Sequence, residues 1–405
     1  MTKRTYYRYV IVLGLLTAIG PFSIDMYLPG FEDIAASLGT TAAMVTLSLS
    51  SFFVGISVGQ LLYGPLMDRF GRKKPLYAGL ALYIAATFVC METNDIHTLI
   101  VLRFIQAIGA CAAQVGAMAM VRDLFGPEES AKVFSLLLLV LGASPMIAPT
   151  AGGYIVSVWS WRIVFLVLLI MATVITLLTI FLLPESYPED RQFSLKPLPI
   201  LRNFLAVLRV KQFLVYVFVQ AFAFSGLLAY VSGSPLLFMG YFHLSKRTYG
   251  WVFAFLAVAF IGLSQLNGLL LRRYKSERIV RVALAGQAAV SVLFVVGMLA
   301  GWYGLGFTIF FLFAFLTCLG FVNPNASALA LAPFSKNAGT AAAMLGFFQL
   351  GIGTVASVAV GVFSNGTPVP LVVVMAVTSF IAMAVLWAGQ GSLATSPSGK
   401  DLSTR

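Results

Sequence analysis

The segment from Gly64 to Leu76 reads GPLMDRFGRKKPL, and it decides how the rest of the chain is interpreted. It contains two glycines, one acidic and four basic side chains, and it stands between two long apolar runs. Glycine permits a tight turn and close helix packing, and an apolar run of about 20 residues crosses a bilayer core roughly 30 Å thick. We therefore interpret the segment as a turn between two membrane spans, where Asp68, Arg69 and Arg72 form a charge cluster at the membrane face.

The same alternation of apolar runs and short polar breaks continues along the 405 residues. Hydrophobic residues make up 60% of the chain and charged residues only 10%, whereas about a quarter of a soluble domain is charged. We expect an all-α membrane protein with twelve transmembrane helices near residues 8–30, 42–63, 75–92, 98–121, 133–157, 163–183, 213–238, 248–271, 282–301, 304–332, 337–363 and 370–390.

The basic side chains give the direction of these spans. If the N-terminus lies in the cytoplasm, 22 of the 26 Lys and Arg residues fall on the cytoplasmic side, as the positive-inside rule requires. We therefore expect both termini in the cytoplasm and a first span that is retained rather than cleaved as a signal peptide. The net charge of +12 then reflects membrane topology and predicts no nucleic-acid partner.

A longer polar stretch divides the chain into two halves of six spans. We expect a first six-helix bundle at residues 1–190, a cytoplasmic central loop at 191–212, a second six-helix bundle at 213–392 and a cytoplasmic tail at 393–405. The halves repeat weakly, since Gly64 and Gly268 open basic turns while Pro29 and Pro235 end the first span of each half. Such a repeat implies pseudo-symmetric bundles related by an axis along the membrane normal.

Away from the ends of the predicted spans, the sequence places one acid, Asp25, and one base, Arg103. A charge at the bilayer centre costs at least about 2.5–3.5 kcal/mol unless it faces a cavity or a partner, so both residues are candidates for function. Burial in an apolar cavity favours a neutral carboxyl group, and we expect Asp25 to bind and release a proton. In the alternative interpretation Asp25 caps or bridges helices, and Arg103 extends outward to the membrane interface.

The segment Gly64–Leu76 resembles the G-x-L-x-D-R-x-G-R-[KR] loop of the major facilitator superfamily. The resemblance implies a gating loop made by Gly64, Asp68, Arg69, Gly71 and Arg72. It also implies that the cluster latches the two halves on the cytoplasmic side, with Asp68 near the start of the eleventh span at residues 337–340. The alternative is an ordinary basic cytoplasmic turn.

Two further segments carry the resemblance. Arg103 and Gln106 match an R-x-x-Q-G pattern in which Ala107 replaces the usual glycine, and the family places this arginine in the cavity, coupled to protonation. The fifth span resembles the antiporter motif G-P-x-x-G-G, with Ala148 replacing its first glycine. Its members here are Pro145, Pro149, Gly152 and Gly153, and the motif is typical of exporters. Without the resemblance, the fifth span is simply a helix that proline permits to kink.

The stretch IDMYLP, which contains Asp25, resembles a signature of the bicyclomycin and chloramphenicol resistance (Bcr/CflA) branch of drug:proton antiporters. The resemblance implies a proton-coupled multidrug exporter in a bacterial inner membrane, where proton and substrate compete for Asp25. We expect a monomer with the proton as coupling ion, no other cofactor and no metal. The candidate substrate-binding residues are Asp25, Tyr27, Gln60, Gln114, Phe222, Tyr230, Asn323, Asn325 and Gln349.

Three alternatives remain at this point. A membrane enzyme would need clustered His, Asp or Glu residues, and the predicted spans contain no histidine and, away from their ends, one acid. A channel would need charged rings or a filter of carbonyl groups, which the two-half repeat does not suggest. Among transporters, the alternative is an exporter of a metabolite such as an amino acid or a sugar.

Overall fold

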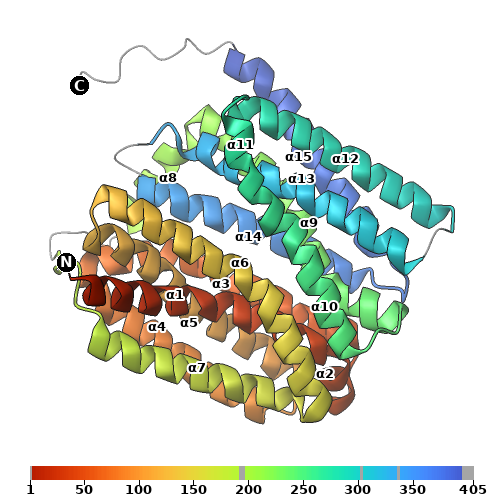
Figure 1. Ribbon diagram of the computed structural model, residues 1–405, viewed down its shortest axis with the longest axis horizontal. Helices are drawn as coiled ribbons and strands as arrows, with labels where there is room; N and C mark the ends of the chain where they lie inside the picture. The colour runs from red at the N-terminus through yellow and green to blue at the C-terminus, as the bar shows by residue number, and fades with distance from the viewer. Residues whose placement is uncertain (1, 191–196, 302–303, 335–337, 395–405) are drawn as a thin grey trace.

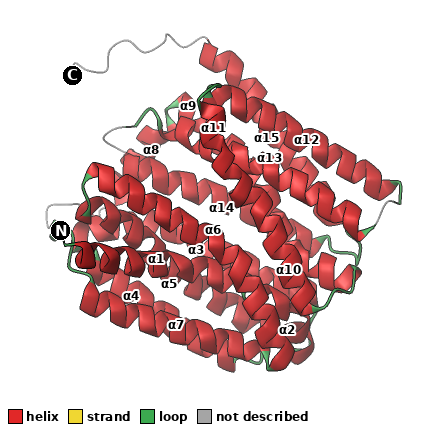
Figure 2. Cartoon of the chain, viewed as in Figure 1, coloured by secondary structure: helices red, strands yellow, loops and turns green. Residues whose placement is uncertain are grey.

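The computed structural model describes residues 2–190, 197–301, 304–334 and 338–394, and within these ranges the chain forms helices and no strand (Figure 2). The first half contains six long helices. They are α1 (Lys3–Asp25), α3 (Ala42–Phe70), α4 (Lys73–Glu92), α5 (Ile96–Leu124), α6 (Pro127–Val158) and α7 (Trp161–Leu182). A 3₁₀ turn (Leu28–Gly30) and α2 (Phe31–Ser37) extend the first span beyond Asp25.

The second half repeats this plan with more irregular helices. Its spans begin with α9 (Lys211–Pro235) and a π-helical turn (Leu236–Tyr241), followed by an eighth span made of α10 (Lys246–Ala257), two irregular turns (258–266) and α11 (Asn267–Leu271). The remaining spans are α12 (Ser276–Leu299), α13 (Leu305–Leu331), α14 (Ala338–Val362) and α15 (Val369–Ala394). As the weak repeat predicts, Pro29 and Pro235 both stand where the first span of a half changes its helical type.

The prediction of twelve membrane spans is confirmed, because twelve helices or runs of helices among the described residues are long and apolar enough to cross a bilayer. Two local details differ from expectation. Helix α3 continues to Phe70, so Gly64 is helical and the chain turns only at Gly71, whose positive φ of 78° suits glycine. A helix, α8 (Pro197–Leu208), occupies most of the described part of the predicted central loop.

The helices form two bundles that lie side by side (Figure 1). In the first bundle α5 packs against α1, α3 and α4, and in the second α9 packs against α13, α14 and α15. The bundles meet mainly where α3 packs on α14 and where α6 packs on α10, and we call this interface the seam. We call the end of the molecule that carries the turn at Gly71 the basic end, and the end that carries α2 the far end.

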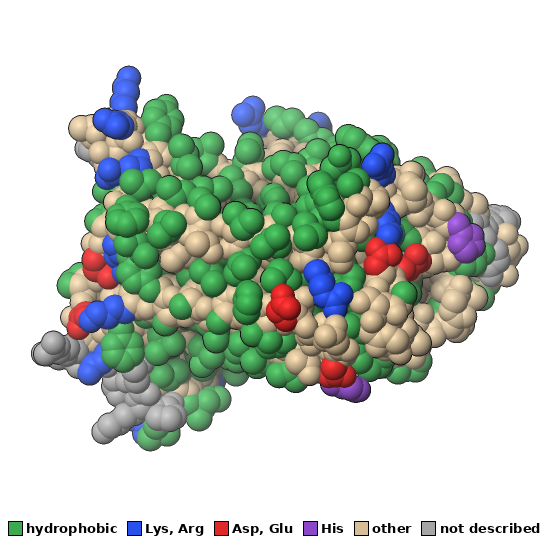
Figure 3. Space-filling view, turned by 90° about the horizontal axis from the view of Figure 1, so that it is seen from below, with side chains coloured by type: hydrophobic (Ala, Val, Ile, Leu, Met, Phe, Trp, Pro, Cys, Tyr) green, Lys and Arg blue, Asp and Glu red, His purple; other side chains and the backbone are tan. Residues whose placement is uncertain are grey.

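Large hydrophobic side chains cover the outside of both bundles. Phe181, Leu139 and Trp387 are examples, with 77%, 66% and 67% of their surface exposed. Figure 3 shows hydrophobic side chains over much of one face, with fewer charged side chains, some of them near its centre. This distribution suits a surface that lipid covers, and the chain is a multi-pass membrane protein.

Candidate functional site

Arg103 lies entirely inside the first bundle, on α5. Its side chain is fully buried, and its guanidinium donates hydrogen bonds to Oε1 of Gln106 at 2.6 Å and to the carbonyl oxygen of Ser23 at 2.9 Å. The guanidinium carbon also lies 4.2 Å from the ring centre of Phe52 and 4.5 Å from that of Tyr27. In this structure Arg103 therefore does not extend to a membrane interface.

A network of polar side chains holds Arg103 in place. Gln106 donates from Nε2 to Oγ1 of Thr87 at 2.7 Å, and the hydroxyls of Ser23 and Tyr83 are 2.6 Å apart. Removing a charge from water costs several kcal/mol, and these hydrogen bonds together with the aromatic rings offset part of that cost. Because the network joins α1, α4 and α5, it fixes the end of α1 relative to the rest of its bundle.

Asp25 is the last residue of α1 and is 5% exposed. No described residue forms a hydrogen bond or an ion pair with its carboxyl group, and Arg103 is not within ion-pair distance. Tyr230 of α9 and Tyr249 of α10 are buried in the same hydrophobic core cluster as Tyr27, which follows Asp25 by two residues. Asp25 is thus an unpaired acid at the seam, at the negative end of a helix dipole, where its charged form is disfavoured.

The glycines of α6 bring that helix into contact with this position. A Cβ atom at Gly152 would lie 2.3 Å from the carbonyl oxygen of Met26, the residue after Asp25. A Cβ atom at Gly153 would lie 2.5 Å from the carbonyl oxygen of Lys246 on α10. Pro145 and Pro149 lie inside α6, which is assigned as one continuous helix. The motif therefore packs α6 against the backbones of both bundles near the far end.

Polar contacts across the seam add to this packing. Nζ of Lys246 lies 2.5 Å from Oδ2 of Asp33, joining α10 to α2. Between α3, α14 and α9, the hydroxyl of Ser357 is 2.6 Å from that of Ser50 and 2.5 Å from that of Ser232. All three serines are buried. The far end is thus closed by close packing, a hydroxyl chain and an ion pair.

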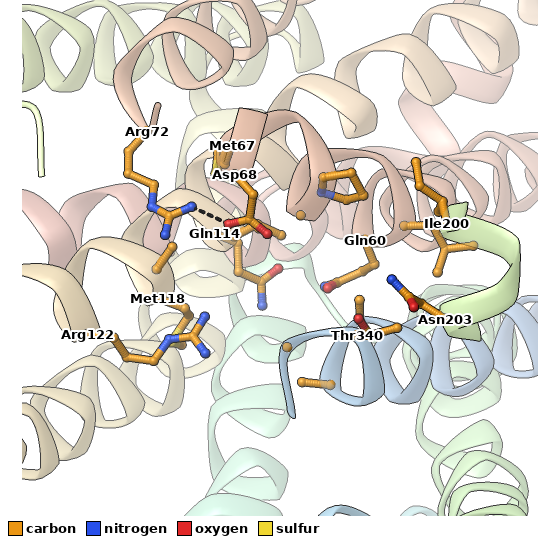
Figure 4. Close-up of a pocket in the computed structure, with 18 of the residues that line it drawn as sticks. Gln60, Met67, Asp68, Arg72, Gln114, Met118, Arg122, Ile200, Asn203 and Thr340 are labelled. Carbon is orange, nitrogen blue, oxygen red and sulfur yellow. Dashed lines mark hydrogen bonds and ion pairs between the residues drawn. The ribbon is translucent and has the colours of Figure 1, made fainter. Parts of the chain in front are cut away.

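A cavity of about 660 Å³ opens instead at the basic end. Its walls come from both bundles and from α8, and Figure 4 shows Gln60 and Gln114 on one side with Asn203 and Thr340 across from Gln60. Gly64, Asp68 and Arg72 also line it. The candidate residues Gln60 and Gln114 therefore reach the cavity, whereas Asp25 is not among the residues that line it.

The charge cluster at the mouth of the cavity is centred on Arg72. Its guanidinium lies 2.7 Å from a carboxylate oxygen of Asp68 and 2.7 Å from one of Asp123, and its backbone N–H donates to Glu185 at 2.8 Å. Burial acts to lower the pKa of Arg72, but the hydrogen bonds to Asp123 and Asp68 outweigh it, so the pKa lies above its usual value. Arg69 donates to the backbone carbonyl of Asp190 at 3.1 Å.

These partners all belong to the first bundle or to the segment that follows α7. Thr340, inside the expected partner region of the second bundle, lines the opposite side of the cavity, while residue 337 lies outside the described residues. Among the described residues, Asp68 is paired only with Arg72. Among the described residues, Asp68 therefore forms no ion pair or hydrogen bond with the second bundle, and the expected latch is not closed in this structure.

The candidate residues of the second bundle form two small polar groups. Oδ1 of Asn323 accepts hydrogen bonds from Nε2 of Gln220 at 2.8 Å and from Nε2 of Gln349 at 3.1 Å. Asn325 donates to Oδ1 of Asn267 at 2.7 Å. These groups place amide side chains of α9, α13 and α14 together inside the apolar second bundle.

The aromatic candidates lie in the packed interior. Tyr27 is buried and its hydroxyl is 2.7 Å from that of Ser48, whereas the hydroxyl of Tyr230 is buried without a hydrogen-bond partner among the described residues. The ring of Tyr230 stacks on Phe253 at 5.5 Å. Phe222 is half-buried and lies beside Phe218.

The family model of the Major Facilitator Superfamily matches residues 13–357 of the chain. The chain belongs to the major facilitator superfamily. It is therefore a transporter and not an enzyme, as the sequence predicts.

Individual relatives agree with this assignment. The chain is 32% identical over 373 residues to the uncharacterized MFS-type transporter YdgK of Bacillus subtilis, covering 91% of this chain and 92% of that one. It is 30% identical over 375 residues to a bicyclomycin resistance protein homolog of Haemophilus influenzae, covering 92% and 94%. The resemblance to the bicyclomycin and chloramphenicol resistance branch is thus confirmed.

Solved structures show the same fold. The crystal structure of a D-xylose-proton symporter superposes with a TM-score of 0.76 at 15% identity, covering 98% of this chain and 99% of that one. At this identity the likeness concerns the fold alone. The shared fold agrees with the twelve-helix architecture of this chain.

Sequence reasoning missed several residues of this transporter. Gln220 was detectable as a polar residue inside the seventh apolar run, but its place beside Asn323 was not. Ser23 contributes a backbone carbonyl to Arg103, which no side-chain pattern reports. Asp33 and Lys246 are charged residues near span ends, and only the fold shows that they meet.

Proposed function

We propose that this transporter is a proton-coupled antiporter that exports small amphipathic drugs by alternating access, with Asp25 as the site that proton and substrate share. The observation that carries the proposal is the position of Asp25. It is an acid without a described partner, buried where the closed far end brings the two bundles together. The name of the Haemophilus relative, a bicyclomycin resistance protein homolog, supports a drug as substrate.

The protonation state of Asp25 would control the seam. A neutral carboxyl group tolerates the apolar surroundings of the closed far end, whereas a carboxylate there costs several kcal/mol. Loss of the proton would therefore favour separation of the bundles at the far end, which lets water reach the charge. Binding of a proton would favour closure again.

The orientation of the chain makes this coupling an export cycle. With the basic end in the cytoplasm of a bacterium, the cavity lined by Gln60 and Gln114 opens to the cell interior, and the far end opens to the outside. A drug that enters from the cytoplasm and reaches Asp25 favours release of the proton inward. The far end then opens, the drug leaves and a proton from outside restores the neutral acid.

The proton gradient supplies enough free energy for this work. One proton contributes about 1.4 kcal/mol per pH unit and about 2.3 kcal/mol per 100 mV of membrane potential. Since 1.4 kcal/mol corresponds to a tenfold concentration ratio, the two terms together can hold a drug gradient of a few powers of ten.

A second candidate is a proton-coupled exporter of a metabolite such as an amino acid or a sugar. It is favoured by the amide group of Gln220, Asn323 and Gln349, where Oε1 of Gln220 is buried without a described hydrogen-bond partner. Such amides suit a substrate with several hydroxyl or amino groups. Most of the buried residues around the seam are apolar, which suits an amphipathic drug better.

An efflux assay on whole cells tests the function. Cells that express the transporter are loaded with fluorescent lipophilic cations such as ethidium, and efflux is followed with and without a protonophore. We expect faster efflux than from cells with an empty vector, and loss of the difference when the protonophore is added. Efflux that persists after collapse of the gradient would contradict proton coupling, and export of labelled sugars or amino acids alone would favour the second candidate.

A further inference from the structure

Helix α8 lies at the basic end, in the segment that joins the two bundles, and packs against α9 and α14 (Figure 1). One side of α8 faces the protein. Val207 is fully buried in the core of the second bundle, and Phe204 and Leu208 pack beside it. Ile200 and Asn203 line the mouth of the cavity (Figure 4).

The other side of α8 exposes a stripe of three leucines. Leu198, Leu201 and Leu205 are 58%, 50% and 44% exposed. Their spacing of three and four residues places them on one face of the helix. Contact with protein therefore accounts for only one side of this helix, and the leucine stripe is left uncovered by the described residues.

Basic side chains border the stripe. Arg202 follows Leu198 by four residues and lies next to it on the helix surface. Arg209 follows Leu205 by four residues and stands just beyond the end of α8. Lys211 follows at the start of α9. All three are exposed, and residues 197–212 contain no acidic residue. An apolar stripe with a basic border is the pattern of a helix that lies in the surface of an anionic membrane.

We propose that the leucine stripe of α8 inserts into the headgroup layer of the bilayer, and that Arg202, Arg209 and Lys211 bind the phosphate groups of anionic lipids there. Each basic residue near an anionic surface strengthens such binding by about fivefold. The inner side of the same helix lines the cavity mouth. Lipid binding therefore fixes the position of one edge of the cavity. The proposal concerns lipid binding and is independent of which substrate is transported.

Depth-dependent quenching in nanodiscs tests the proposal on the whole protein. A fluorophore is placed on Leu201→Cys in a Cys318→Ala background, since Cys90 and Cys111 are buried. The matched control is Ala206→Cys, which is exposed on another side of the same helix. The discs contain phosphatidylcholine alone or equal parts of phosphatidylcholine and phosphatidylglycerol, each with a lipid that carries a quencher just below its headgroup.

We expect at least about twofold stronger quenching at position 201 than at position 206 in the discs with phosphatidylglycerol. Quenching at position 201 should fall in phosphatidylcholine alone, and equally in the triple variant Arg202→Gln, Arg209→Gln and Lys211→Gln. Equal quenching at the two positions would overturn the proposal. So would strong quenching at position 201 that changes neither with lipid charge nor in the triple variant. Leu205→Cys gives the same test if the variant at position 201 does not elute as a single folded species.

Discussion

Arg103 donates a hydrogen bond from Nη2 to the carbonyl oxygen of Ser23 at 2.9 Å, and Ser23 stands two residues before Asp25 on α1. The last carbonyl groups of a helix have no partner within the helix, and a cation at that end is favourable. The arginine thus stabilises the end of α1 without forming an ion pair with Asp25. This arrangement allows the acid to stay unpaired while its position is fixed.

Substitution of Arg103 tests whether this fixed position matters for transport. Arg103→Ala leaves Gln106 and the Ser23 carbonyl without their donor, at a cost of about 1–3 kcal/mol for each buried group left unpaired. We expect the variant to reach the membrane, to unfold at a lower temperature and to lose most proton-dependent efflux. Arg103→Lys keeps the positive charge but cannot donate two hydrogen bonds in the fixed directions of a guanidinium. We therefore expect Arg103→Lys to recover more of the lost stability than of the lost efflux. Normal efflux by Arg103→Ala would contradict this role.

The glycine at position 152 gives a test of the packing near Asp25. In Gly152→Ala the new Cβ would lie 2.3 Å from the Met26 carbonyl oxygen, so α6 must move away from α1. Overpacking of this kind costs about 1–3 kcal/mol, and we expect a lower unfolding temperature in detergent with reduced efflux. Gly306→Ala is the matched control, because a Cβ at that helical position meets nothing within 4 Å. An equal loss in both variants would exclude a specific effect of the α6 contact.

The ion pair between Asp33 and Lys246 should help to keep the far end closed. Lys246→Ala removes one partner of a bridge between the bundles, and an exposed or half-buried pair contributes about 0–1 kcal/mol. We expect a modest shift toward the state open at the far end, measured as faster labelling of a cysteine at Ser357, which is buried in the seam. The exchanged pair Asp33→Lys with Lys246→Asp should reverse the shift. Equal labelling in all of these variants would mean that the ion pair does not hold the seam.

Asp68 should control the opposite end. Because the cluster lies at the mouth of the cavity, we expect Asp68→Asn to favour the state open at the basic end and to slow transport. Cysteines at Leu61 and Ala343, which line the cavity from α3 and α14, can report this in a chain without the three native cysteines. Cross-linking between them should fall in Asp68→Asn. Unchanged cross-linking with lost transport would point to another role for Asp68, such as folding or topology.

Arg72 itself is not expected to carry the coupled proton. Its hydrogen bonds to Asp123 and Asp68 hold its pKa above the usual value despite burial, so it stays charged throughout the physiological range. Arg72 is therefore a permanently charged structural residue at the cavity mouth. It also directs attention to Asp25 as the group that exchanges protons.

The sequence predicts much of this architecture because its signals are local. Runs of apolar residues mark the twelve spans, and the spacing of Arg103 and Gln106 places both on one face of α5, where they form a hydrogen bond. Contacts between distant segments leave no such signal. The pairing of Asp33 with Lys246 and the contact of Gly152 with Met26 depend on how the bundles meet. Helix α8 was not predicted, because its twelve residues are too few to span a membrane and it lies within the break between the two halves.

The most direct test of proton exchange at Asp25 is a measurement of proton movement in proteoliposomes. An outward gradient of a transported lipophilic cation is imposed across vesicles that contain either the wild-type chain or Asp25→Asn, and a trapped pH dye reports the lumen. The unfolding temperature of both chains is measured in parallel, to confirm that the variant is folded. We predict that drug leaving the wild-type vesicles drives protons inward and acidifies the lumen, whereas Asp25→Asn, whose neutral side chain favours the closed far end, moves no protons. Proton movement at the wild-type rate in Asp25→Asn would contradict the role assigned to Asp25.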